Sequence, residues 1–155
     1  MNIITGNLLS QDTACIVNPW NVNIIPRWLF LPGGVTAQLK KVTGPAPFHE
    51  LARHGWLSPG SATLTAGGML NKPIIHVAGL NLLWRSSEAI VSRCTASALA
   101  LADEQGFASM AMPLIGAGTG GLSAEQSLRA ISVAAESSES TCELYIVLWD
   151  GSARR

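Results

Sequence analysis

The sequence predicts an α/β protein, a three-layer α/β/α sandwich with a mixed, largely parallel sheet of about six strands. Short apolar runs alternate with helical patterns along its 155 residues, which is the order expected of strands joined by crossover helices. Several of the runs are apolar at every position, as central strands covered on both faces are. A chain of this length suits one domain, so we expect residues 1–155 to form a single domain.

Six short apolar runs are the predicted strands. They are residues 2–6, 15–18, 61–66, 73–79, 110–116 and 144–149. His76 lies inside the fourth run, where a hydrogen-bonded structural histidine is commoner than a catalytic one. Because ligands of largely parallel sheets bind outside the carboxyl ends of the strands, the candidate site should lie at that edge.

Four helices are predicted from apolar spacing and from their end signals. The first, over 33–44, carries Val35, Leu39 and Val42 on one face and stops at Gly44. The second, over 47–55, has a proline in its first turn and a terminal glycine. The third, over 86–106, is capped by Ser86 or Ser87 and stops at Gly106, and the fourth, over 123–136, opens with a Ser123–Gln126 capping box.

Composition limits the classes of partner. Only 13% of the residues are charged, against about 25% in an ordinary soluble domain, and 48% are hydrophobic. The ten Lys and Arg residues equal the ten Asp and Glu residues, so no net field attracts nucleic acid or a membrane surface, and we expect neither partner. No apolar run reaches the roughly 18 residues of a membrane span, and the N-terminus lacks the pattern of a signal peptide.

The three cysteines, Cys15, Cys94 and Cys142, are odd in number and widely spaced. They form no C-x-x-C pattern, so neither a disulfide framework nor a zinc site is indicated. We expect buried free thiols in a reducing cytoplasm, with no metal and no cofactor.

Two candidate ligand-binding segments lie in the first quarter of the chain. Asn18 is at the end of a predicted strand and Asn21 is in the next loop, where amides either bind ligand hydroxyls or form Asx-turns. Gly33 and Gly34 precede a helix whose first N–H groups have no internal partner, so this segment is either an anion site or an ordinary tight turn. The residues alone leave both alternatives open.

A third segment, PLIGAGTGGLSAEQ at 113–126, holds four glycines within six residues, between a strand and a capped helix. That density favours a loop that cradles phosphate. The spacing Gly-x-Gly-x-x-Gly matches a dinucleotide-binding turn, but that turn opens a βαβ unit and needs an acidic residue at a strand end about 20 residues later. Here the loop comes late, and Glu136 and Glu139 fall on the tail of the helix or in the loop after it. No Lys-Ser/Thr follows, which excludes a Walker A loop.

Taken in order, these segments resemble a macrodomain, the ADP-ribose-binding module, over nearly the whole chain. The family opens with a strand and Gly-Asp, where this chain has ITGNLL, and continues with Ile-Val-Asn-Ala-Ala-Asn, where it has IVNPWN. PGGVTAQLKKVTG stands for the family's Gly-Gly-Val-Asp-Gly and helix, and GSATLTAGGML and KPIIHVAG stand for the next two strands. GAGTGG is similar to the family's final glycine loop. Each match is weak alone, but five in the right order are specific.

The resemblance implies the role of each matching position. Asn7 and the N–H of Leu8 take the place that recognises the adenine amino group, Trp149 would pack on the adenine, and Asn21 would face the distal ribose. The expected ligand-binding set is Asn7, Leu8, Asn18, Asn21, Gly33, Gly34, Val35, Ile115, Gly116, Ala117, Gly118, Thr119, Gly120, Gly121, Leu122 and Trp149.

The chain departs from the family pattern at several of these places. Asn7 replaces an Asp, and a neutral amide binds an amine about half as strongly as a carboxylate does. Thr36 stands where hydrolases that act on ADP-ribosylated acidic side chains have a catalytic Asp, and threonine is not a base near neutral pH. The final glycine loop also lacks the Asp that another hydrolase branch uses with a Lys. Trp28 and Phe30 precede the first helix, either as an apolar lid or as core residues.

Three functions therefore fit the sequence. The leading hypothesis is binding of ADP-ribose or of an ADP-ribosylated protein or metabolite. The second is hydrolysis of ADP-ribosyl esters or of O-acetyl-ADP-ribose by substrate assistance, with Asn21 positioning a water and no protein base. The third is a sensor of NAD or another ADP-containing metabolite.

Overall fold

The computed structural model describes residues 1–20 and 34–150. Its elements follow one another as β1 (Asn2–Gly6), η1 (Leu8–Ser10), β2 (Cys15–Trp20), α1 (Gly34–Thr43), α2 (Ala46–Arg53), β3 (Ala62–Thr65), η3 (Gly68–Leu70), β4 (Ile74–Ala78), α3 (Glu88–Glu104), β5 (Ser109–Met112), α4 (Ala124–Glu136) and β6 (Glu143–Trp149). Within the described residues, no helix combines the length and the apolar character needed to cross a membrane.

Six strands form one sheet in the order β1-β6-β5-β2-β4-β3. All neighbours run parallel except β3, which lies antiparallel to β4 at one edge. The prediction of a mixed, largely parallel sheet of six strands is confirmed. Because β2, β4, β5 and β6 point the same way, the loops that follow them emerge at one edge of the sheet.

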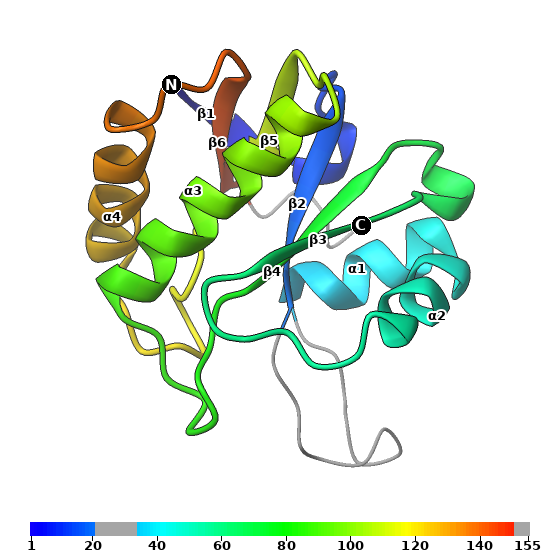
Figure 1. Ribbon diagram of the computed structural model, residues 1–155, viewed down its shortest axis with the longest axis horizontal. Helices are drawn as coiled ribbons and strands as arrows, with labels where there is room; N and C mark the ends of the chain where they lie inside the picture. The colour runs from blue at the N-terminus through cyan, green and yellow to red at the C-terminus, as the bar shows by residue number, and fades with distance from the viewer. Residues whose placement is uncertain (21–33, 151–155) are drawn as a thin grey trace.

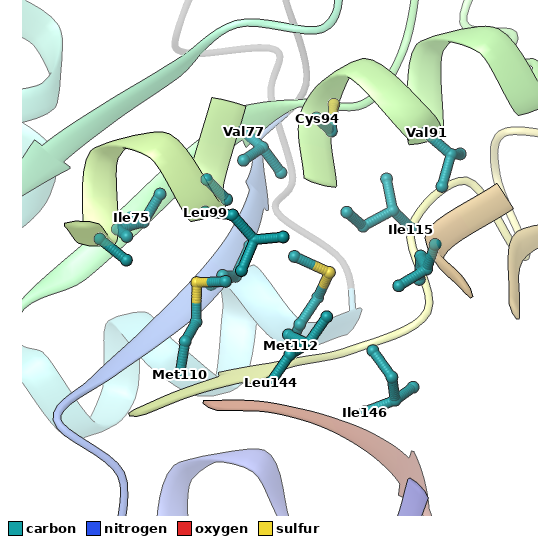
Figure 2. Packing of buried hydrophobic residues seen from close by; sticks show 14 of the residues in the cluster. Ile75, Val77, Val91, Cys94, Leu99, Met110, Met112, Ile115, Leu144 and Ile146 are labelled. Atoms are coloured by element: carbon teal, nitrogen blue, oxygen red, sulfur yellow. The ribbon is translucent and has the colours of Figure 1, made fainter. Parts of the chain in front are cut away.

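Helices cover both faces of the sheet, and α3 and α4 lie side by side on one of them (Figure 1). Alternate residues of each strand face opposite layers, so Cys15 and Val17 join the cluster under α3 and α4, whereas Ile16 joins the cluster with Leu39 of α1. Figure 2 shows the larger cluster, in which Val91, Cys94 and Leu99 of α3 pack over Met110 and Met112 of β5. The three-layer architecture is thus confirmed.

The predicted helix ends largely hold. Ser87 caps α3 by accepting from the N–H of Ile90, and Ser123 and Gln126 form the predicted capping box of α4. The prediction for Val42 was wrong, since this residue is 40% exposed although it shares its spacing with the buried Leu39. The helix ends one residue later, and Thr43 takes the buried place instead.

Two predicted strand ends were wrong in ways that affect the site. The run 110–116 is a strand only as far as Met112, because Pro113 has no N–H to donate to a neighbouring strand. Conversely, β2 continues past Asn18 to Trp20 and keeps its pairing with β4. The proline at 19 is tolerated because the pairing of β2 with β5 ends at Ile16, so one side of the strand needs no further donor. Asn18 therefore lies within the strand and not at its end.

Candidate functional site

Four buried polar side chains form a continuous chain of hydrogen bonds beneath the carboxyl edge of the sheet. His76 of β4 is the lateral neighbour of Asn18 in β2, and the two side chains meet with Nδ2 of Asn18 3.1 Å from Nδ1 of His76. The other ring nitrogen, Nε2, lies 2.8 Å from the hydroxyl of Thr65 in β3. At the far end, Thr36 of α1 donates to Oδ1 of Asn18 at 3.0 Å. The chain thus links three strands to the first helix.

The direction of each hydrogen bond follows from the chemistry of the two ends. The Thr65 hydroxyl donates to the carbonyl of Ala66 at 3.0 Å, so it accepts from Nε2–H of His76. Nδ1 of His76 is then an acceptor for the amide N–H of Asn18, which orients that amide. Burial, helped by the charge of His54, lowers the pKa of His76 to about 3, so the ring is neutral. His76 is fully buried and hydrogen-bonded at both ring nitrogens, as predicted for a core histidine.

Thr36, which the family resemblance matches to the hydrolases' Asp, is a hydrogen-bond donor in this network. Its hydroxyl is shared between Oδ1 of Asn18 and the carbonyl of Pro19, at 3.0 and 3.2 Å. Both partners are acceptors, so the hydroxyl hydrogen is committed to them. The side chain is 8% exposed. This geometry gives Thr36 the task of holding Asn18 and the end of β2 in place.

Trp20, the last residue of β2, packs beside this network against Phe48 of α2. Its ring lies 5.9 Å from the ring of Phe48, and Phe48 meets His76 edge-on with centroids 6.0 Å apart. Aromatic pairs of this geometry add to the stabilisation from buried area. Trp20 therefore contacts the buried histidine indirectly, through Phe48.

The structure brings the two predicted adenine-reading positions to neighbouring strand ends. Gly6, just before Asn7, is the lateral partner of Trp149, and Trp149 is 53% exposed. Oδ1 of Asn7, however, accepts from the N–H of Leu9 at 2.9 Å and caps η1. The amide oxygen that would accept from adenine is thus already engaged by the backbone, and Leu8 is buried at 8% exposure.

The glycine loop, residues 113–122, folds back on itself after β5. Gly116, Gly118 and Gly121 have φ of +75°, +99° and +83°, which side chains with a Cβ rarely adopt. The N–H of Gly121 donates to the carbonyl of Gly118 and the N–H of Leu122 to that of Gly116, both at 3.1 Å. These bonds close the loop into a compact turn.

Several backbone donors of this loop have no acceptor within residues 1–20 and 34–150. Among the described residues, no group accepts from the N–H of Gly116, Ala117, Thr119 or Gly120. Successive N–H groups in a turn with positive φ form a concave site for anions. Gly120 also has no room for a side chain, because a Cβ there would lie 2.6 Å from the carbonyl oxygen of Gly116.

Buried contacts anchor the glycine loop to the sheet and to α4. The hydroxyl of Ser127 donates to the carbonyl of Ile115 at 2.6 Å, and both residues are fully buried. Gly79, after β4, packs so closely on Ile115 that a Cβ would come within 2.9 Å of its Cγ2. The loops that follow β4 and β5 are therefore neighbours, as the shared strand direction requires.

Other predicted residues are placed differently or lie elsewhere. Gly34 is the first residue of α1, and Val35 packs against the smaller core cluster. Asn21, Gly33, Trp28 and Phe30 lie outside the described residues. A separate cavity of about 340 Å³ lies at the opposite edge of the sheet, lined by Met1, Leu99, Ala135, Glu136, Ser138, Ser140, Cys142, Glu143 and Leu144.

Two contributors to this region were not found from the sequence. The sequence predicts Thr65 only as part of the strand over 61–66, and Ser86 only as one of two candidate helix caps. Their roles depend on neighbours distant in the chain, which residue patterns do not show. The sequence does carry a weak signal for Ser86: a helix needs only one capping residue, and Ser87 can fill that place, so the second serine is left for another role.

The sequence model of the Macro domain family matches residues 17–131. The chain belongs to the Macro domain family. This macro domain is 31% identical over 152 residues to a protein of Aquifex aeolicus, covering 97% of this chain and 89% of that protein. It is 29% identical over 145 residues to the O-acetyl-ADP-ribose deacetylase of Salmonella gallinarum, covering 85% and 77%.

Solved macrodomain structures share the fold. A mutant macrodomain of Oceanobacillus iheyensis with ADPR superposes with a TM-score of 0.77 at 21% identity, covering 95% of this chain and 83% of that one. The macrodomain of Trypanosoma brucei in complex with ADP-ribose gives 0.75 at 22% identity, covering 95% and 62%. At such identity the likeness extends to the fold alone.

Proposed function

We propose that this macro domain binds ADP-ribose, free or attached to a protein or metabolite. The observation that carries the proposal is the glycine loop, where four N–H groups have no acceptor among the described residues. A diphosphate supplies negatively charged oxygens that accept hydrogen bonds from such N–H groups. The O-acetyl-ADP-ribose deacetylase among the relatives, 29% identical, supports the choice of this diphosphate.

The remaining parts of the proposed site lie along the same edge. Asn18 is held in a single orientation by His76 and Thr36, and Trp149 ends β6 beside the start of η1. We propose that the ligand spans from Trp149, at its adenine end, across the glycine loop. Asn21, Gly33 and Gly34 remain proposed contacts on the other side of the diphosphate.

Titration calorimetry with ADP-ribose tests the proposal. Several hydrogen bonds to a charged acceptor, each contributing about 1.5–3 kcal/mol, suffice for the net free energy near −8 kcal/mol of a micromolar complex. The variant Gly120→Ala should bind at least about tenfold more weakly, because its Cβ would collide with the Gly116 carbonyl. Gly106→Ala is the control for lost stability alone: this glycine has φ of +73°, so alanine there strains the backbone, but nothing of the glycine loop is near it and the affinity should not change. Absence of heat with the wild type at about millimolar ligand would refute the proposal.

A second candidate function is hydrolysis of O-acetyl-ADP-ribose or of an ADP-ribosyl ester, favoured by the deacetylase among the relatives. Because Thr36 donates its hydrogen to two acceptors, such a reaction would proceed without a base at that position. Asn21 is the proposed positioning residue for the attacking water. The rate of hydrolysis should then differ between the wild type and Asn21→Ala. Equal rates in the two proteins would show that this site takes no part in the reaction.

We further propose that residues 1–155 constitute one macro domain that works in the cytoplasm without a nucleic-acid partner. The family match over 17–131 supports the first part. Competition binding of ADP-ribose against ADP and NAD measures which ligand is preferred. An ADP-ribose-binding domain should bind ADP-ribose more tightly than NAD, whereas a sensor of NAD should bind NAD more tightly.

A further inference from the structure

The segment that joins β4 to α3, residues 79–87, is a fixed turn and touches the glycine loop. Oδ1 of Asn81 accepts from the N–H of Leu83 at 2.9 Å and from that of Arg85 at 3.1 Å. The N–H of Asn81 donates back to the carbonyl of Arg85 at 2.8 Å. Trp84 is held at φ of +61°, an unusual value for a residue with a large side chain. These bonds set where Arg85 and Ser86 stand.

Ser86 packs against two glycines of the glycine loop, Gly116 and Gly120. Its N–H donates to the carbonyl of Gly120 at 2.9 Å. Its hydroxyl oxygen is only 2.6 Å from the place of a Cβ on Gly116, and its own Cβ is 2.8 Å from the place of one on Gly120. Small residues at 116 and 120 thus make room for this serine.

The Ser86 hydroxyl is also buried at an energetic cost. In the described part of the chain it is the one buried side-chain nitrogen or oxygen that has no hydrogen-bond partner. Leaving a buried hydroxyl unsatisfied is unfavourable, so native proteins keep few of them. An anionic oxygen held by the glycine loop would provide the missing acceptor.

Arg85 brings a full positive charge to the same loop. Its Nη1 lies 3.4 Å from the place of a Cβ on Gly121, and no carboxylate among the described residues pairs with it. The loop itself offers only the partial charges of its N–H groups. A guanidinium at the rim matches the geometry and the charge of a phosphate.

We propose that Arg85 and Ser86 are ligand-binding residues, which recognise the charged diphosphate together with the glycine loop. This inference rests on the proposed function, since it specifies what selects the ligand at that site. Arg85 provides the charge that distinguishes a diphosphate from an uncharged nucleoside, and Ser86 donates a hydrogen bond to the same anion. Neither residue is expected to contact the adenine.

Calorimetry with two probes, ADP-ribose and ADP, tests the inference. Arg85→Gln should weaken both ligands by the same factor, about tenfold, and should flatten the dependence of Kd on salt concentration. Arg85→Lys should recover part of the affinity. Arg53→Gln removes the same charge from the last turn of α2 and should leave both affinities and the salt dependence unchanged.

Ser86→Ala separates a ligand contact from a structural role. Without ligand, this variant should melt at the same temperature as the wild type or higher, because it removes an unsatisfied hydroxyl. Its affinity for both probes should nevertheless fall, by about threefold to tenfold. A lower melting temperature with unchanged affinity would overturn the role of Ser86.

The outcomes also separate this inference from the proposed function. If the wild type binds neither probe, the proposed function fails. If the wild type binds ADP-ribose and Arg85→Gln binds it equally well with the same salt dependence, the inference alone fails. Weakening of ADP-ribose but not of ADP would place Arg85 at the distal ribose and would likewise overturn it.

Discussion

Protonation of His76 should make the stability of this macro domain depend on pH between about 6.5 and 3. The folded protein keeps this ring neutral because burial lowers its pKa from 6.5 to about 3. In the unfolded chain the ring takes up a proton near its ordinary pKa. The unfolded state therefore binds more protons than the native state throughout that interval, and the free energy of unfolding falls as the pH falls.

The size of the effect follows from the two pKa values. At about pH 7.5 both states are neutral at His76 and the residue contributes no pH dependence. At about pH 5 nearly every unfolded molecule carries the proton and nearly no folded one does, which lowers the free energy of unfolding by about 2 kcal/mol. The full loss is reached only below about pH 3, where the folded ring is protonated as well.

Urea unfolding of the wild type and of His76→Gln at a series of pH values isolates this residue. Glutamine can accept from Asn18 and donate to Thr65, so the variant keeps the polar chain but cannot titrate. Other titrating groups are common to both proteins and cancel in the difference. Between about pH 7.5 and 5 the wild type should lose about 2 kcal/mol more than the variant. Equal losses, or a His76 resonance that titrates near its ordinary pKa, would refute the reasoning.

Three further outcomes are expected. Ser127→Ala should lower the free energy of unfolding by about 1–3 kcal/mol and weaken ADP-ribose binding, because the buried Ile115 carbonyl loses its donor; Ser132→Ala, elsewhere on α4, should leave binding unchanged in the same calorimetric assay. Cys15 and Cys94, whose pKa burial raises to about 12, should react with Ellman's reagent at about pH 8 only in denaturant, and rapid labelling of either thiol in the native protein would contradict this. Arg129→Ala should not change the melting temperature, since its ion pair with Glu88 is exposed, and a clear decrease would show that the pair stabilises the fold.

Most of the fold could be predicted because it depends on local patterns. Continuous apolar runs gave the strands, and the caps at Ser87 and Ser123 gave helix starts that the structure keeps. Strand ends were harder. The extension of β2 to Trp20 depends on where its pairing with β5 stops, and that is a property of two segments more than ninety residues apart, as the partners Ile16 and Ala111 show.

The candidate site was predicted in part. The glycines at 116, 118 and 121 could be recognised because positive φ leaves few other residues available. The adenine-reading role of Asn7 stays a prediction, and the structure adds that its oxygen already caps η1. A sequence shows that an amide is present but not which backbone group it has bound.

By itself, the sequence determined the layer architecture, the place of the glycine loop and the absence of an acid at position 36, because periodicity, backbone freedom and side-chain ionisation belong to single residues or to short segments. Only the tertiary structure decided which side chains contact one another. It aligned Thr65, His76, Asn18 and Thr36 into one chain of hydrogen bonds across three strands and a helix. It also set Arg85 and Ser86 against the glycine loop. Hydrogen bonds and steric contacts of this kind depend on distances between remote segments, and those distances exist only once the chain is folded.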